Sequence, residues 1–216
     1  MLAACSDRQS QSDRAYAELV NRLTSLRIGP GSPIDEALIA AELAISRSSI
    51  REAMRRLAAD RLVTTHPQRG TFASTIGITD LSCICDVRIA LEGHAAHRAA
   101  ERHATIDHPA LRRLRCDLTR DRHSGDLQQR LELYARVHRF LYHATANPHM
   151  EETMSRYLNL SLRIWRYVTV RLPSHFIPFD DHDSLLAAIA AGHSARAKCL
   201  QTRHIATFEQ AVRAAL

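Results

Sequence analysis

Apolar residues recur at helical spacing over most of this chain, and one short stretch of β-prone residues interrupts the pattern. From residue 14 the apolar positions advance in steps of three and four, which predicts an amphipathic helix. These first positions are Tyr16, Val20, Leu23 and Leu26. Glycine and proline alternate over residues 28–33 and should end this helix. Residues 1–13 are mostly polar and lack the periodicity, so we expect a disordered tail there.

A second and a third helix follow in quick succession. The pattern predicts a short helix over 36–43, a tight turn, and a helix over 47–59 for which Ser46 is placed as the N-cap. Two β-prone runs, 62–65 and 71–73, flank a turn that contains proline and glycine, which is typical of a hairpin. Helix, helix, tight turn, helix and hairpin together predict a winged helix-turn-helix over residues 14–74.

The rest of the chain is expected to be all-helical. Residues 75–79 form a short linker, and residues 80–216 contain six helical segments separated by glycine, proline and asparagine. The segments are 80–103, 108–123, 126–146, 149–171, 180–191 and 194–214. Turns at Ser124-Gly125, Pro173 and Pro178 separate some of them. The fold class is therefore mainly α: a winged helix-turn-helix followed by a six-helix antiparallel bundle.

Composition narrows the class of protein. The 216 residues are 45% hydrophobic and 24% charged, as in globular chains. No apolar run approaches the roughly 20 residues that a membrane helix needs, so we expect no membrane span. The five cysteines are scattered, which fits a reducing cytoplasm better than a disulfide framework. The net charge of +6 allows a nucleic-acid partner.

Positive charge gathers where DNA binding would need it. Arg47, Arg51 and Arg55 share one face of the third predicted helix, and Arg69-Gly70 lies at the hairpin tip. Arginine pairs bidentately with guanine, and glycine lets the backbone approach DNA closely. A single charged helix face is often only solvated. Because the charge continues into the hairpin tip, double-stranded DNA is the favoured partner.

Three histidines lie on apolar faces of three different predicted helices: His138, His182 and His204. Each one alone is best interpreted as a hydrogen-bonded core residue. Imidazoles that converge from facing helices can also build a metal site, and three suffice for Zn²⁺ or Ni²⁺ with one position open. Spacing alone does not decide between three core histidines and a metal site.

Arginines of the second half are candidate anchors for an anionic effector. A guanidinium can hold a carboxylate bidentately, which makes Arg88 a candidate. The alternative for Arg88 is an intrahelical ion pair with Glu92, four residues further on. Arg163, close to Trp165 in the sequence, is a second candidate for the pocket.

The N-terminal half resembles the GntR-type regulators. The resemblance is carried by Pro30-Gly31, by the run from Ile45 to Leu57, and by Arg61-Leu62-Val63 and Arg69-Gly70-Thr71-Phe72. It implies that Arg47, Ser48 and Arg51 contact operator bases or phosphates and that Gly70 lies at the wing. The chain departs from the family pattern at Ala44 and at Arg61, where glycine is usual.

The C-terminal half resembles the FCD-type ligand domain of the FadR subgroup, and its six helices resemble the shorter, VanR-like branch. In that domain an Asp-His-His-His set binds a metal, with the Asp four residues before the first histidine. Here that position is Tyr134, and a phenol that ionises near ~10 is a poor ligand at neutral pH. The resemblance therefore leaves three histidines for the metal, and Arg88, Tyr134 and Arg163 as effector-binding candidates.

These features predict a ligand-responsive transcription regulator: a repressor that a small carboxylate releases from DNA. A two-fold homodimer on a short inverted repeat is expected, because one recognition helix reads only a few base pairs. We find no nucleophile elbow, phosphate-binding loop, HExxH or dinucleotide motif, so no enzymatic activity is expected. The alternatives are a metalloenzyme that uses the three histidines and an architectural DNA-binding protein without a ligand.

Overall fold

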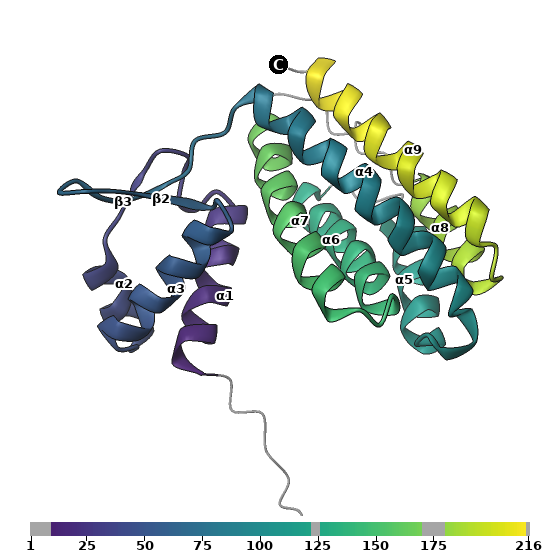
Figure 1. Ribbon diagram of the computed structural model, residues 1–216, viewed down its shortest axis with the longest axis horizontal. Coiled ribbons are helices and arrows are strands. Elements are labelled where there is room, and N and C mark those ends of the chain that lie inside the picture. Colours follow the sequence, from purple (N-terminus) through teal and green to yellow (C-terminus); the bar gives the residue numbers. More distant parts are fainter. Residues whose placement is uncertain (1–9, 122–125, 170–179, 215–216) are drawn as a thin grey trace, which may run out of the picture. The chain divides into compact units, whose positions relative to one another are not determined.

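The computed structural model describes residues 10–121, 126–169 and 180–214 (Figure 1). The chain forms two compact units, Met1–Ile76 and Gly77–Leu216. The predicted fold class, a winged helix-turn-helix followed by a bundle of six helices, is confirmed. Within the described residues, none of the helices combines the length and apolarity that crossing a bilayer requires.

The N-terminal unit packs three helices against a small antiparallel sheet. Its second and third helices have the bounds predicted from the sequence, and the sheet has the strand order β1-β3-β2. The elements are α1 (Gln11–Thr24), β1 (Pro33–Ile34), α2 (Glu36–Leu43), α3 (Arg47–Ala59), β2 (Val63–His66) and β3 (Gly70–Ala73). Leu19, Leu23, Ile50 and Leu57 are fully buried and hold α1 against α3.

The first helix starts earlier than its apolar pattern indicates. Residues 10–13 were expected to belong to the disordered tail, and that is wrong: α1 begins at Gln11. The reason is a capping box, in which Ser10 Oγ accepts the Asp13 amide at 3.0 Å and Asp13 accepts the Ser10 amide. Asp13 also binds Arg56 of α3 at 2.7 Å. Residues 1–9 of the predicted tail lie outside the described residues.

Strand β1 has no counterpart in the sequence-based expectation, and it ties the wing to the start of α2. Ile34 pairs with Thr71 of β3. The next residue, Asp35, caps α2 by accepting the amides of Ala37 and Leu38 at 2.9 and 3.0 Å. Glu36 then accepts the Thr71 hydroxyl at 3.2 Å. Ile34 and Glu36 thus fasten the hairpin to the helix-turn-helix on either side of the Asp35 cap.

The C-terminal unit is a bundle of six α-helices within the described residues, joined by one short 3₁₀ turn (His103–Thr105). The helices are α4 (Ile78–Glu101), α5 (His108–Asp121), α6 (Leu127–Ala144), α7 (Pro148–Thr169), α8 (Asp180–Ala190) and α9 (Ser194–Ala214). Helix α4 runs along α9 and also packs on α6, α7 and α8 (Figure 1). The predicted turns at Ser124-Gly125, Pro173 and Pro178 lie outside the described residues.

Close contact between α4 and α9 depends on Gly93. A methyl group at Gly93 would lie 2.7 Å from the hydroxyl oxygen of Thr202, so a larger residue here would force the Thr202 side chain or the helices to shift. Alanines of α4 with no exposed surface, Ala96 and Ala100, continue the contact face. The approach brings Glu92 of α4 to Gln201 of α9, which matters for the buried site described next.

Candidate DNA-binding surface and candidate metal centre

The six residues that the sequence assigned to DNA binding are all exposed. Ser46 caps α3 by accepting the amide of Ser49 at 3.2 Å, and this fixes the start of the helix at Arg47. Four of the six lie on α3 and two at the β2–β3 turn: Arg47, Ser48, Arg51, Arg55, Arg69 and Gly70. The backbone of Gly70 is left-handed, with φ of 92°, which explains glycine at this position.

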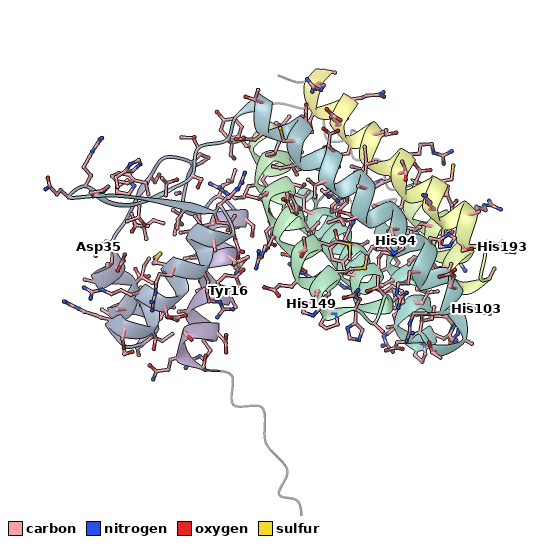
Figure 2. All side chains as sticks on the ribbon, in the orientation of Figure 1. Tyr16, Asp35, His94, His103, His149 and His193 are labelled. Atoms are coloured by element: carbon pink, nitrogen blue, oxygen red, sulfur yellow. The ribbon has the colours of Figure 1, made fainter. Side chains whose placement is uncertain are left out.

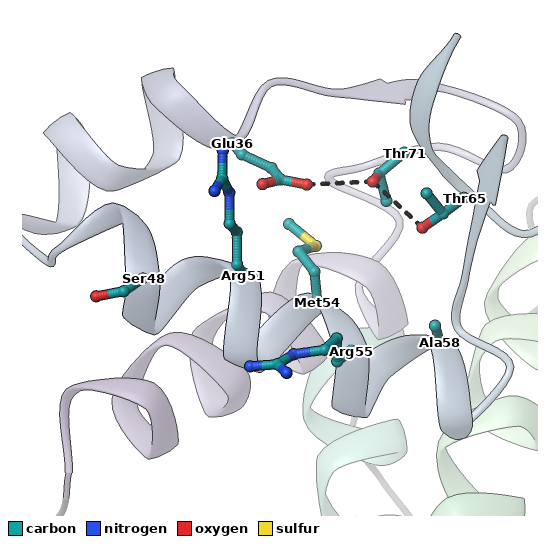
Figure 3. A pocket seen from close by; sticks show the side chains of 8 residues that line it. All are labelled: Glu36, Ser48, Arg51, Met54, Arg55, Ala58, Thr65 and Thr71. Carbon is teal, nitrogen blue, oxygen red and sulfur yellow. Dashed lines mark hydrogen bonds between the residues drawn. The ribbon is translucent and has the colours of Figure 1, made fainter. Parts of the chain in front are cut away.

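A hollow of about 530 Å³ separates α3 from the wing (Figure 3). It brings together three of the six residues, Ser48, Arg51 and Arg55, with Glu36 and Thr71 opposite. Figure 3 shows Arg51 reaching from α3 toward Glu36. Arg55 is exposed but forms an ion pair with Glu52. Arg47, Arg69 and Gly70 do not line the hollow.

Both departures from the family pattern fall on left-handed backbone. Ala44, the C-cap of α2, has φ of 52°, and Arg61, after the C-cap of α3, has φ of 60°. A side chain in this region costs roughly 1–2 kcal/mol, which glycine avoids. Ala44 and Arg61 therefore strain the backbone, and neither is among the six residues assigned to DNA binding.

The three histidines converge in the core of the helical unit. His138 of α6, His182 of α8 and His204 of α9 are each no more than 1% exposed. Each offers a ring nitrogen, and these three atoms lie within 4.8 Å of one another. The Nε2 atoms of His138 and His182 are 3.4 Å apart. Ligands at about 2.1 Å from a tetrahedral zinc ion are separated by about 3.4 Å, so this pair has the spacing of metal ligands.

Protonation and hydrogen bonding also suit a metal. Burial lowers the pKa of His138, and burial followed by the neighbouring histidines lowers the pKa of His182 and His204 further. The imidazoles are therefore neutral, which is the form that binds metals. Among the described residues, neither ring nitrogen of His204 has a hydrogen-bond partner. A buried polar group without a partner is costly, and an ion would satisfy it.

Tyr134 stands among the three histidines. Its ring centroid is 4.3 Å from that of His138 and 5.4 and 5.5 Å from those of His182 and His204. Burial raises the pKa of Tyr134 to about 12, so the phenol stays protonated at neutral pH. The position at which the resemblance implies a carboxylate is thus neutral in this chain.

Arg88 forms the intrahelical pair that was one of its two interpretations. Its Nε donates to Glu92 at 2.6 Å, and its Nη2 donates to the Tyr134 hydroxyl at 3.1 Å. Both side chains of the ion pair are fully buried. The Nη1 of Arg88 has no hydrogen-bond partner within the described part of the chain.

Arg163 is also buried, and burial lowers its pKa to about 10. Trp165, two residues on, packs against Tyr134.

Sequence reasoning did not assign Tyr142 or Gln201 to this cluster, and it considered Glu92 only as the ion-pair partner of Arg88. Tyr142 follows His138 by four residues and Gln201 precedes His204 by three, so helical spacing puts each beside a candidate ligand. Both donate to Glu92, at 2.7 and 2.6 Å. By contrast, His94, His149 and His193 are exposed (Figure 2).

Comparison with known families agrees with this architecture of a winged helix-turn-helix joined to an all-helical domain. The FCD domain matches residues 83–207, and the family described as bacterial regulatory proteins, gntR family, matches residues 11–73. The chain therefore belongs to the GntR family of bacterial regulators and carries an FCD domain.

Individual relatives are similar over different lengths. The Nta operon transcriptional regulator of Aminobacter aminovorans is 30% identical over 146 residues, 67% of this chain and 68% of that protein. An HTH-type transcriptional regulator of Agrobacterium vitis is 38% identical over 86 residues, 40% of this chain but only half of the relative's length. The match to the solved structure of E. coli McbR/YncC covers 93% of this chain and 98% of that chain. The TM-score is 0.79 and the sequence identity is 20%, so the two chains share a fold.

Proposed function

We propose that this protein is a one-component transcription repressor of the FadR subgroup, in its shorter VanR-like branch, whose helical domain binds a divalent metal and a small carboxylate. The supporting observation is that one chain joins a GntR-type DNA-binding unit to a domain with three buried, neutral histidines. The division into a DNA-binding domain over 14–74 and a sensing and dimerisation domain over 80–216 belongs to this proposal. The protein acts in the cytoplasm as a homodimer on an inverted repeat.

The DNA contacts follow from exposure and side-chain chemistry. Arg47, Ser48 and Arg51 on α3 read bases or adjacent phosphates, because the first turns of this helix carry them to the surface. Arg55, already paired with Glu52, contributes to phosphate contact. Arg69 and Gly70 approach the backbone or minor groove from the wing.

His138, His182 and His204 would hold the metal, either Zn²⁺ or Ni²⁺, and the metal would supply a Lewis-acid position for an anion. The neutral histidines and the protonated Tyr134 do not balance the charge of a divalent cation. An anionic effector is therefore favoured, with Arg88, Tyr134 and Arg163 as its candidate contacts. Electrostatics argues against neutral and cationic effectors.

The test is fluorescence anisotropy with DNA from the region upstream of the gene that encodes this protein, with Zn²⁺ and a panel of small organic acids. A carboxylate effector should change operator affinity by about 5- to 150-fold. A variant with His182→Gln and His204→Gln should lose the response, while His94→Gln, an exposed control, should keep it. Binding of DNA that no metal or acid alters would favour an architectural protein, and turnover of an added acid would favour an enzyme.

A further inference from the structure

One carboxylate organises the buried site. Glu92 of α4 has no exposed surface and forms hydrogen bonds with its own helix and with two of the helices that surround it. Arg88 and Gln201 donate at 2.6 Å, Tyr142 donates at 2.7 Å, and Nδ1 of His138 lies at 2.9 Å. These partners come from α4, α6 and α9.

The bond to His138 determines which ring nitrogen carries the proton. One oxygen of Glu92 accepts from Arg88 and Tyr142, and the other accepts from Gln201, so the carboxylate is surrounded by donors and acts as an ionised acceptor. Nδ1 of His138 lies 2.9 Å from Glu92 but 3.4 Å from both Nη2 of Arg88 and the Tyr142 hydroxyl. Because the shortest contact is to a carboxylate, which can only accept, we assign the proton to Nδ1. A neutral imidazole carries one proton, and Nε2 is therefore left with its lone pair. That nitrogen lies 3.4 Å from Nε2 of His182.

We propose that Glu92 is the positioning residue of the histidine cluster: through its bond to Nδ1 it fixes the tautomer and ring direction of His138, so that Nε2 faces His182 and His204. Carboxylates that hold metal-binding histidines in this way usually matter about 10- to 100-fold for metal affinity. Through Tyr142 and Gln201 the same carboxylate fastens α6 and α9 to α4. The inference rests on the proposed metal function for its effect on affinity, but the tautomer is a property of the metal-free protein.

The first experiment is nitrogen NMR of the metal-free, full-length protein at pH 8, with His138 assigned by comparison with His138→Gln. The expected result is a proton on Nδ1 of His138. A second preparation, Arg88→Met with Glu92→Met, removes both buried charges together, because a lone buried charge would unfold the chain. In it the Nε2-protonated tautomer should appear and Zn²⁺ affinity should fall about 10- to 100-fold.

The matched control is Glu101→Gln. Glu101 lies on the same helix and also pairs with a histidine, His97 at 3.2 Å, but this pair is exposed. The Glu101→Gln substitution should change neither the tautomer of His138 nor the affinity for Zn²⁺.

The possible outcomes separate the two proposals. If the wild-type protein shows the proton on Nδ1, loses it in the double variant, and binds no Zn²⁺, the metal function fails while the positioning role stands. If the wild-type protein carries the proton on Nε2, or if the folded double variant keeps both the tautomer and the Zn²⁺ affinity, the positioning role is overturned.

Discussion

The Tyr134 hydroxyl accepts a hydrogen bond from Arg88 at 3.1 Å, while the Tyr134 ring packs against all three cluster histidines. This tyrosine therefore bridges the arginine of α4 and the candidate metal ligands. The resemblance to the FCD-type domains implies a metal-binding carboxylate at this position. The chain offers a large, neutral side chain where a small anion would be expected.

Replacing Tyr134 should separate packing from metal binding. Tyr134→Asp supplies the missing carboxylate, so Zn²⁺ affinity should rise, as measured by titration calorimetry. The metal-free variant should lose roughly 3–5 kcal/mol of stability, because a buried aromatic ring is removed. Tyr134→Phe keeps the ring and should leave Zn²⁺ affinity nearly unchanged. An Asp variant that folds and binds Zn²⁺ no better than the wild-type protein would contradict the assigned position.

The two left-handed residues offer a route to a more stable DNA-binding unit. Ala44→Gly and Arg61→Gly should each stabilise this unit by about 1 kcal/mol, because glycine adopts positive φ without strain. Thermal and urea unfolding would measure the change. Ala41→Gly, inside α2, is the control and should destabilise by about 1 kcal/mol. Destabilisation by all three substitutions would show that the backbone is not strained at these positions.

Two arginines of α3 should differ in how they bind DNA. Arg51→Ala should weaken operator binding by about 1–3 kcal/mol and relax sequence preference, as for a base contact. Arg55→Ala should weaken binding to all sequences alike and reduce the salt dependence by about one unit. Arg112→Ala, exposed on α5, changes the net charge equally and serves as the control. Equal effects of all three would mean that overall charge, not α3, determines affinity.

Cysteine labelling tests the packing of α4. Cys83, Cys116 and Cys199 are exposed, whereas Cys85 is buried and its pKa is raised to about 12 by burial. Because the thiolate is the reacting form, Cys85 should stay unlabelled by iodoacetamide from pH 7 to 9, while the exposed thiols react. In denaturant Cys85 should become reactive. Peptide mass spectrometry gives the readout, and rapid native labelling of Cys85 would show that this face of α4 is open.

The sequence predicts local structure better than it predicts the site. Helix α3 has its expected bounds because Ser46 and the apolar period both mark it, and α1 starts early because the Ser10–Asp13 capping box contains no apolar residue. Strand β1 has only two residues, too few for any period. The three histidines could be placed on the inward faces of their helices from the sequence. The role of Glu92, however, depends on contacts with His138 and Gln201, which lie 46 and 109 positions further along the chain. No local pattern reveals such contacts.

The fastening of β1 and Glu36 to Thr71 of the wing has a consequence for regulation. Because Ile34 and Glu36 both attach to Thr71 of β3, on either side of the Asp35 cap of α2, we expect the wing and α2 to move as one rigid body. In a dimer, an effector would then change only the distance and angle between two such bodies. We therefore expect the order of DNA affinity among operators with one base pair added or removed between the half-sites to change when the effector is present.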